Sequence, residues 1–355
     1  MIPKQWPFKL RPHREELLSS FLTRSAHAHG SSPYIFLNLF WPGYPIWTRD
    51  IDRDPDLNWL KELAAICGTP AARLFDCTLN QYRMSLAGKL NRNGDTPLLL
   101  SASIYHQTRK RHALQYCSIC LGGRSPYYRR SWRLGFVLMC DEHMVSLRDA
   151  CPSCDAPVIP HRSLGVKLHS CHSCMASLVT SDTPSVSAAV SDFQKQLMAL
   201  LSDHSGARIG PFQGIDAFRV SRILISICTD KPAHSLIRTA LGLPALSEMN
   251  RDSMQLERAR WHTRHLLIET VAHWLSDWPY NFHQGANKAR LTQQRFIRLS
   301  LPISLRSEVN ALPRGFSRNR RFVSILDDVP LRRLRRRDIF EFKRVRGERL
   351  LRAAK

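Results

Sequence analysis

Cys117-Ser-Ile-Cys120 opens a series of four similar motifs in the middle of the chain, and the others are Cys140-Asp-Glu-His143, Cys151-Pro-Ser-Cys154 and Cys171-His-Ser-Cys174. In each motif two residues separate a pair of metal-binding side chains, and such a turn points both side chains at one centre. Residues 121–139 separate the first two motifs and residues 155–170 the last two, lengths typical of a zinc ribbon or a treble-clef-like knuckle. A tetrahedral site takes two turns, so the four motifs predict two zinc ions.

The motifs are paired in the order in which they occur. We assign the first site to Cys117, Cys120, Cys140 and His143, and the second site to Cys151, Cys154, Cys171 and Cys174. Four protein donors leave no open coordination position, which indicates structural rather than catalytic zinc. Disulfides would need an oxidising compartment, and a redox pair would explain one motif but not four. Because structural zinc supplies folding energy, its removal is expected to unfold this region.

The composition is that of an ordinary globular chain. Its 355 residues suit two or three domains, and a hydrophobic content of 43% is enough for buried cores. No run of about 18 apolar residues occurs and the N-terminus lacks an apolar signal core, so we expect a cytoplasmic protein with no membrane partner. The other cysteines, Cys67, Cys77 and Cys228, fall in apolar helical patterns and are expected to be buried and inert.

Positive charge is concentrated near the C-terminus. The net charge is +23, and residues 286–355 contain 20 basic and 6 acidic residues. Such a segment attracts polyanions, and nucleic acid is the leading candidate. We therefore expect phosphate contacts from Arg332, Arg333, Arg335, Arg336, Arg337, Lys343, Arg344 and Arg346. The alternative is a solvated tail that aids solubility, whereas a membrane surface would need a more continuous apolar face.

A second basic stretch, Tyr127-Tyr-Arg-Arg-Ser-Trp-Arg133, lies between the first two metal motifs. Interleaved aromatic and basic side chains are typical of nucleic-acid and protein-binding surfaces. Arg129, Arg130 and Arg133 are therefore candidate nucleic-acid contacts. The other interpretation is a strand with Trp132 and Leu134 buried and the arginines outside, and the sequence leaves both open.

The remaining segments are mostly helical in pattern. Apolar spacing predicts helices over 14–29 and 56–67, each followed by glycine, whereas the Pro- and aromatic-rich residues 31–55 predict a packed irregular segment. Later helices are expected at 193–201, 218–228, 234–241, 254–274, 290–310 and 331–355, after a polar linker over 180–192. The alternating acids Asp50, Asp52, Asp54 and Asp56 indicate a surface turn rather than a nuclease site.

Residues 59–79, WLKELAAICGTPAARLFDCTL, read as helix, glycine and helix, and resemble a helix-turn-helix. Its second helix offers only Arg73 and Arg83 as basic side chains, so the pattern gives little support for reading bases. The sequence thus predicts a mainly α fold with a central zinc-ribbon-like module of small β content. The expected domains are a helix-turn-helix-like helical domain over 1–105, a tandem zinc-binding module over 106–180, a C-terminal helical domain over 181–285 and a basic helical or tail region over 286–355.

In combination these motifs resemble the TniQ/TnsD family of transposition target-selection proteins. The resemblance rests on Glu16-Leu-Leu-Ser-Ser-Phe-Leu-Thr-Arg24, Tyr116–Leu121, Arg130-Ser-Trp-Arg-Leu134, the metal motifs and Trp278–His283. It is spread over most of the chain, is looser after residue 185, and does not extend to the arginine-rich end.

The resemblance implies a non-catalytic adaptor that selects the target site for DNA transposition. Its implied partners are DNA and an AAA+ transposition ATPase and, in some members, an RNA-guided CRISPR effector complex; such members can be homodimers. It also implies a bacterial protein that joins the nucleoid when engaged.

Two other classes of function compete with the adaptor. The chain has no phosphate-binding G-x-x-x-x-G-K-[ST] loop and no G-x-S-x-G nucleophile motif, so we expect no enzymatic activity. A zinc deaminase using Glu142 is disfavoured because every C-x-x-[CH] pair already has a partner pair. The alternative that stays open is a sequence-specific, zinc-containing DNA-binding regulator, which would need base-reading side chains such as Asn80, Gln81 and Arg83.

Overall fold

A computed structural model describes residues 5–86, 90, 94–102, 104–105, 108–109, 111–163, 167–202, 206–246, 253–297 and 299–315. Residues 1–314 belong to one compact unit and residues 315–355 to another. The arginine-rich C-terminus, with its predicted helix over 331–355 and its predicted phosphate contacts, lies outside the described residues. The domain boundaries at 105, 180 and 285 stay predictions.

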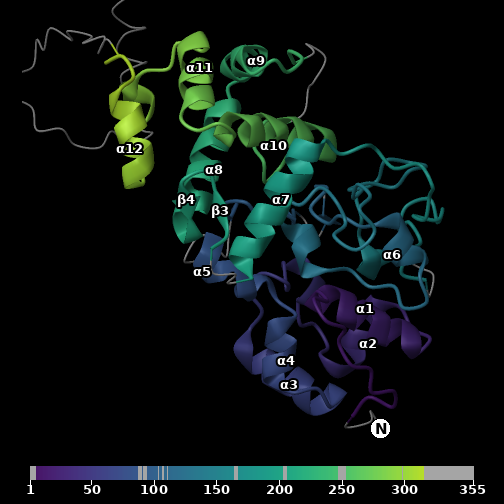
Figure 1. Cartoon of the computed structure of the whole chain (residues 1–355). Helices are drawn as coiled ribbons and strands as arrows, with labels where there is room; N and C mark the ends of the chain where they lie inside the picture. The colour runs from purple at the N-terminus through teal and green to yellow at the C-terminus, as the bar shows by residue number, and fades with distance from the viewer. Residues whose placement is uncertain are drawn as a thin grey trace, which may run out of the picture. The chain divides into compact units, whose positions relative to one another are not determined.

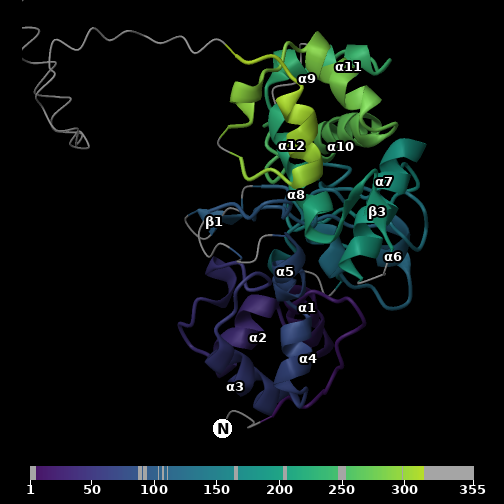
Figure 2. The same cartoon turned by 60° about the vertical axis from the view of Figure 1, so that its left-hand side comes forward.

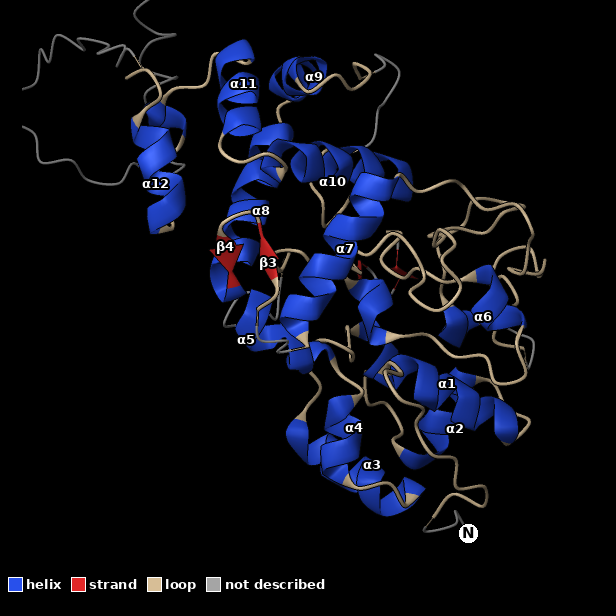
Figure 3. Ribbon diagram, in the orientation of Figure 1, coloured by secondary structure: helices blue, strands red, loops and turns tan. Residues whose placement is uncertain are grey.

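The described part of the chain is mainly helical, which confirms the predicted fold class (Figure 3). The α-helices are α1 (Leu18–Ala28), α2 (Pro33–Phe40), α3 (Leu57–Cys67), α4 (Ala71–Asp76), α5 (Arg83–Leu86), α6 (Ser118–Gly122), α7 (Ala188–Leu201), α8 (Gly214–Cys228), α9 (Lys231–Ala240), α10 (Trp261–Leu275), α11 (Tyr280–Lys288) and α12 (Ile303–Asn310). Two short antiparallel hairpins pair β1 (Ile104–Tyr105) with β2 (Thr108–Arg109) and β3 (Arg208–Ile209) with β4 (Phe212–Gln213). None of the described helices is both long enough and apolar enough to span a membrane.

The first four helices lie together in both views and pack around one apolar cluster (Figures 1 and 2). The interpretation of residues 31–55 as irregular is wrong, because α2 occupies residues 33–40. Ser32 caps this helix by accepting a hydrogen bond from the Ile35 amide (3.4 Å), and Pro33 stands in its first turn, where the missing amide costs nothing. Ser32 and Pro33 together favour the start of a helix, whereas the aromatic composition of the segment had suggested irregular structure.

The predicted helical hairpin over residues 59–79 forms from α3 and α4, which contact each other. Asp56 caps α3 through the amides of Asn58 and Trp59, and Gly68 ends it with φ of 72°, a left-handed conformation that suits glycine. Helix α4 spans only six residues, and its Arg73 donates to the His13 carbonyl (3.1 Å). One of the two basic side chains, Arg73, is therefore occupied by a contact within the protein. A helix-turn-helix that contacts DNA stays a prediction.

Helices α7 to α11 share a core with the metal-binding region. Leu197, Phe218 and Trp274 belong to the same buried cluster as Cys117 and Cys151. Helix α10 begins at Trp261, later than predicted, and the predicted helix over 290–310 is reduced to α12 and a 3₁₀ turn, η5 (Gln293–Arg295). The three remaining cysteines are buried as predicted, and burial raises the pKa of the Cys77 thiol to about 12.

A buried histidine makes these helices sensitive to acid. His234 on α9 is fully buried, and its Nε2 lies 2.7 Å from Thr270 Oγ1. Because the Thr270 hydroxyl donates to the Leu266 carbonyl, the imidazole must donate its Nε2 hydrogen to Thr270. Burial, followed by the nearby charge of Arg238, lowers the pKa of His234 to about 4.

We expect the free energy of unfolding to fall as the pH drops from about 6.5 to about 4. In that pH range His234 is protonated in the unfolded chain but stays neutral in the folded chain. The free energy of unfolding should therefore fall by an amount on the order of 3 kcal/mol. Chemical denaturation at several pH values should show this loss in the unaltered chain and much less of it in His234→Gln, whose amide can still donate to Thr270. Parallel pH profiles for the two proteins would contradict the prediction.

Candidate metal centres

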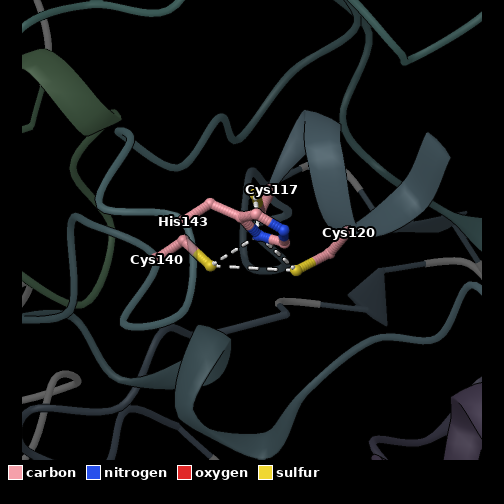
Figure 4. A group of neighbouring side chains, drawn as sticks. All are labelled: Cys117, Cys120, Cys140 and His143. Atoms are coloured by element: carbon pink, nitrogen blue, oxygen red, sulfur yellow. Dashed lines mark hydrogen bonds between the residues drawn. The ribbon is translucent and has the colours of Figure 1, made fainter. Parts of the chain in front are cut away.

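The first metal site brings together three thiols and one imidazole. Cys117 immediately precedes α6 and Cys120 lies within it, whereas Cys140 and His143 come from a following turn. Their four ligand atoms lie within 4.8 Å of one another. His143 Nδ1 is 3.2 Å from Cys120 Sγ and 3.6 Å from the sulfurs of Cys117 and Cys140, and Figure 4 shows the four side chains converging on one centre. Hydrogen bonds from the thiols of Cys120 and Cys140 lower the pKa of Cys117, and the same contacts raise the pKa of Cys120, because the neighbouring sulfurs share their protons.

The second site consists of four thiols. Cys151 Sγ lies 3.7 Å from Cys174 Sγ, and Cys154 Sγ lies 3.7 Å from Cys171 Sγ. Cys151 and Cys171 are buried, whereas Cys154 and Cys174 are exposed. All four sulfurs fall within 4.8 Å of one another, and the described residues contain no third group of this kind. The structure thus brings together all eight predicted ligands in the two predicted sets.

Three of the four motifs share one backbone turn. The amide of the first ligand donates to a carbonyl five residues later, in the pairs Cys140–Val145, Cys151–Ala156 and Cys171–Ala176 (2.8–2.9 Å). The residue after the second ligand has a positive φ and donates back to the first ligand; these residues are Met144, Asp155 and Met175, with φ of 54°, 58° and 62°. Left-handed backbone costs a non-glycine residue about 1–2 kcal/mol, so closing these turns is opposed until a metal holds their side chains together.

The stretch over residues 127–133 is neither an exposed surface nor a strand. Its last four residues form a 3₁₀ helix, η3 (Arg130–Arg133), and all four are buried. Trp132 and Leu134 point inward, as the strand interpretation expected, but the two arginines of η3 lie inside as well. The surface interpretation and the strand interpretation both placed Arg130 and Arg133 outside, and both are wrong on that point.

Arg133, a predicted nucleic-acid contact, is enclosed by the segment that follows α2. Its side chain is 1% exposed, with Nη2 2.6 Å from Asp50 Oδ2 and Nη1 3.3 Å from Asp52 Oδ2. Burial alone would lower the pKa of Arg133, but the two carboxylates outweigh it and raise that pKa. Asp52 is also 1% exposed and accepts two hydrogen bonds from Ser19, so a surface turn is the wrong interpretation of this acid. We call this cluster of Arg133, Asp50 and Asp52 the Arg133 joint.

Arg130 and Arg129 also form ion pairs, with acids near α1 and near the first metal site. Arg130 Nη2 lies 2.6 Å from Glu15 Oε1, and the Arg130 amide donates to the Glu15 carbonyl. Arg129 pairs with Glu142, beside the first metal site. A buried arginine cannot contact a phosphate at the protein surface. The structure buries both Arg133 and Arg130, so their placement does not support the predicted nucleic-acid contacts.

Residues of the motif Glu16–Arg24 form hydrogen bonds with one another and with the metal region. Glu16 is fully buried and accepts from Ser20 Oγ and from Arg24 Nε, each at 2.8 Å. Ser20 in turn accepts from the Tyr128 amide, and the Leu17 amide donates to the Tyr128 carbonyl. These residues therefore fasten α1 to the segment between the first two metal motifs.

Matching contacts fasten the C-terminal helices to the other side of the metal region. Arg264 on α10 is fully buried, 3.2 Å from Asp149 Oδ2, and donates to Gln115 Oε1 at 3.0 Å. The Asp149 carboxylate also accepts from the Trp261 amide (2.6 Å), and Gln194 on α7 accepts from the amides that precede Cys140. The metal region thus lies between two sets of helices and is tied to each by buried polar contacts.

The N-terminal helices and the first metal site fall within a segment that matches a known protein family. Residues 7–147 match the TniQ family model, and no curated protein matches the chain. The matched segment includes Glu16–Arg24, η3, the Arg133 joint and all four ligands of the first metal site. The segment from residue 7 to residue 147 is therefore identified as a TniQ domain.

Proposed function

We propose that this chain is a non-catalytic adaptor that selects target sites for DNA transposition. The TniQ match over residues 7–147 carries the proposal. The contacts within that segment support a scaffold: its ionisable motif residues Glu16, Arg24, Arg130 and Arg133 are engaged with one another or with neighbouring segments. A side chain held in this way positions structure rather than reacting with a substrate.

Zinc is the metal that we propose for both sites. One donor set is three thiols and an imidazole and the other is four thiols, and soft, four-donor sets of this kind suit tetrahedral zinc. Each ion would cross-link the two turns that supply its ligands, and neither would have a position left for a substrate.

The proposed partners are target DNA and an AAA+ transposition ATPase. In one form of the proposal the chain reads an attachment sequence itself; in the other it docks, alone or as a homodimer, on an RNA-guided CRISPR effector and relays its location. The basic residues of 332–346 would hold DNA through phosphate contacts, which position a protein without reading sequence.

Selection of duplex DNA by the purified, metal-loaded protein tests this function. We expect salt-sensitive binding to many sequences, because the DNA contacts that we propose are made to phosphates. Strong enrichment of one motif would favour direct reading and the regulator alternative, and the exposed face near Arg83 would then be the place to look. If the unaltered chain neither bound DNA nor supported targeted insertion beside its ATPase, the adaptor proposal would fail.

A further inference from the structure

A pocket of about 350 Å³ opens where the end of α1 meets the metal region. Most of its lining comes from three segments: the last turns of α1, the loop after α6, and the residues that precede the fourth metal motif. The polar side chains of this lining are Arg24, His27, Arg124, Ser125, Lys167 and His169. We call it the Arg124 pocket. The sequence did not predict a pocket at this position.

The lining of the Arg124 pocket carries positive charge that no acid in the lining balances. Arg24 is committed to Glu16, but Arg124 and Lys167 are exposed and form no ion pair within the described part of the chain. Cations that converge on one hollow repel each other, and an anion bound between them removes that repulsion. The electrostatics of the pocket therefore suit an anionic ligand.

The lining also offers uncharged hydrogen-bonding side chains beside Arg124 and Lys167. With the Ser125 hydroxyl and the His169 ring, the pocket can surround an oxyanion with several donors.

The surface beside the pocket favours a long polyanion over a small ion. Arg24 donates to the Arg11 carbonyl (3.0 Å), so the N-terminal segment passes along the pocket, which Leu10 also lines. This segment carries Lys9, Arg11 and Arg14, all exposed, and no acid between residues 5 and 14. A single phosphate would use the pocket alone, whereas a nucleic-acid backbone would use the pocket and the basic segment together.

We propose that the Arg124 pocket binds a backbone phosphate of DNA, with Arg124 and Lys167 as its charged contacts. This inference rests on the proposed function in requiring DNA as a partner, but it places a DNA contact within the compact unit of residues 1–314, separate from the arginine-rich C-terminus. Phosphate contacts of this kind add affinity without sequence preference.

The test uses the full, metal-loaded chain and random-sequence duplex DNA of about 30 base pairs at several salt concentrations. The variant is Arg124→Ala/Lys167→Ala, and the control is Arg222→Ala/Lys61→Ala, which removes one exposed arginine and one exposed lysine outside the pocket. Each phosphate contact contributes about 0.9 to the slope of log affinity against log salt, so we expect the pocket variant to lower that slope by about 1 to 2 and the control to leave it nearly unchanged. Equal losses in both variants would mean that only net charge matters, and no loss in the pocket variant would mean that DNA does not use the pocket; either result overturns the inference.

A second measurement reports on the pocket directly. Lysine acetylation followed by mass spectrometry should show Lys167 protected by duplex DNA and Lys61 unprotected. Protection by inorganic phosphate but not by DNA would identify a small-anion site and overturn the DNA assignment. Targeted insertion by the unaltered chain, measured beside these assays, separates the two failures: if insertion persists while Lys167 stays reactive, the adaptor function stands and the pocket contact does not.

Discussion

Loss of one metal ligand at an exposed cysteine is expected to unfold the second metal site and loosen the helices on both sides of it. Cys154→Ala makes the sharpest case, because the Cys154 side chain is exposed and its removal takes almost no packing from the core. Binding of a structural zinc ion is worth about 10–16 kcal/mol, as much as or more than the whole stability of a typical domain. The left-handed turns at Asp155 and Met175 would then open, because nothing would balance their cost.

The matched control for this prediction is Cys228→Ala. Cys228 is buried on α8 and belongs to no metal site, so this change removes packing and keeps every ligand. We expect metal analysis to give two ions for the control and one for Cys154→Ala, with the larger drop in melting temperature in the ligand variant and newly reactive thiols in that variant alone. Two bound ions and an unchanged melting temperature in Cys154→Ala would show that the four thiols do not form a structural metal site.

The second large effect is expected at the Arg133 joint. Arg133→Met keeps most of the volume of the side chain but leaves the Asp52 carboxylate buried and without its cation. Breaking a buried ion pair on one side costs about 3–5 kcal/mol, because the remaining charge stays desolvated. Thermal and chemical unfolding should show this loss, and it should exceed the loss for Arg148→Met, whose partner Asp182 is 87% exposed and whose surface pair is worth at most about 1 kcal/mol.

A compensating variant distinguishes lost charge pairing from lost packing. In Arg133→Met/Asp52→Asn the buried Asp52 side chain is neutral while Asp50 keeps its pair with Arg53, so much of the stability lost in the single variant should return. If the double variant were as unstable as Arg133→Met, the joint would be held by shape rather than by charge.

The metal ligands could be predicted from the sequence because each motif encodes its own geometry. A Cys-x-x-Cys turn brings two sulfurs together locally, and only the pairing of turns needs the fold. Helices such as α3 could also be predicted, since Asp56 and Gly68 mark its ends. The start of α2 had comparable signals in Ser32 and Pro33, but the aromatic residues around them suggested an irregular segment.

The Arg133 joint could not be predicted, because an arginine carries no local sign of its partner. Arg133 and Asp52 are far apart in the sequence, and only the packing of α1 against the metal region brings them within 3.3 Å. The same basic residue is typical of a nucleic-acid surface and of a buried ion pair, and burial decides between them. The Arg124 pocket was missed for a similar reason, since its cations come from three separate segments.

Buried polar contacts tie the metal region to the helices around it, through the Arg133 joint on one side and through Arg264 and Asp149 on the other. A flexible tether would let a protein report only that its two partners are near each other. A stiff connection reports more, because it converts the position of whatever is gripped on one side into a set distance and angle on the other. In the proposed adaptor, a stiff connection of this kind would set the spacing between the place recognised and the place of insertion.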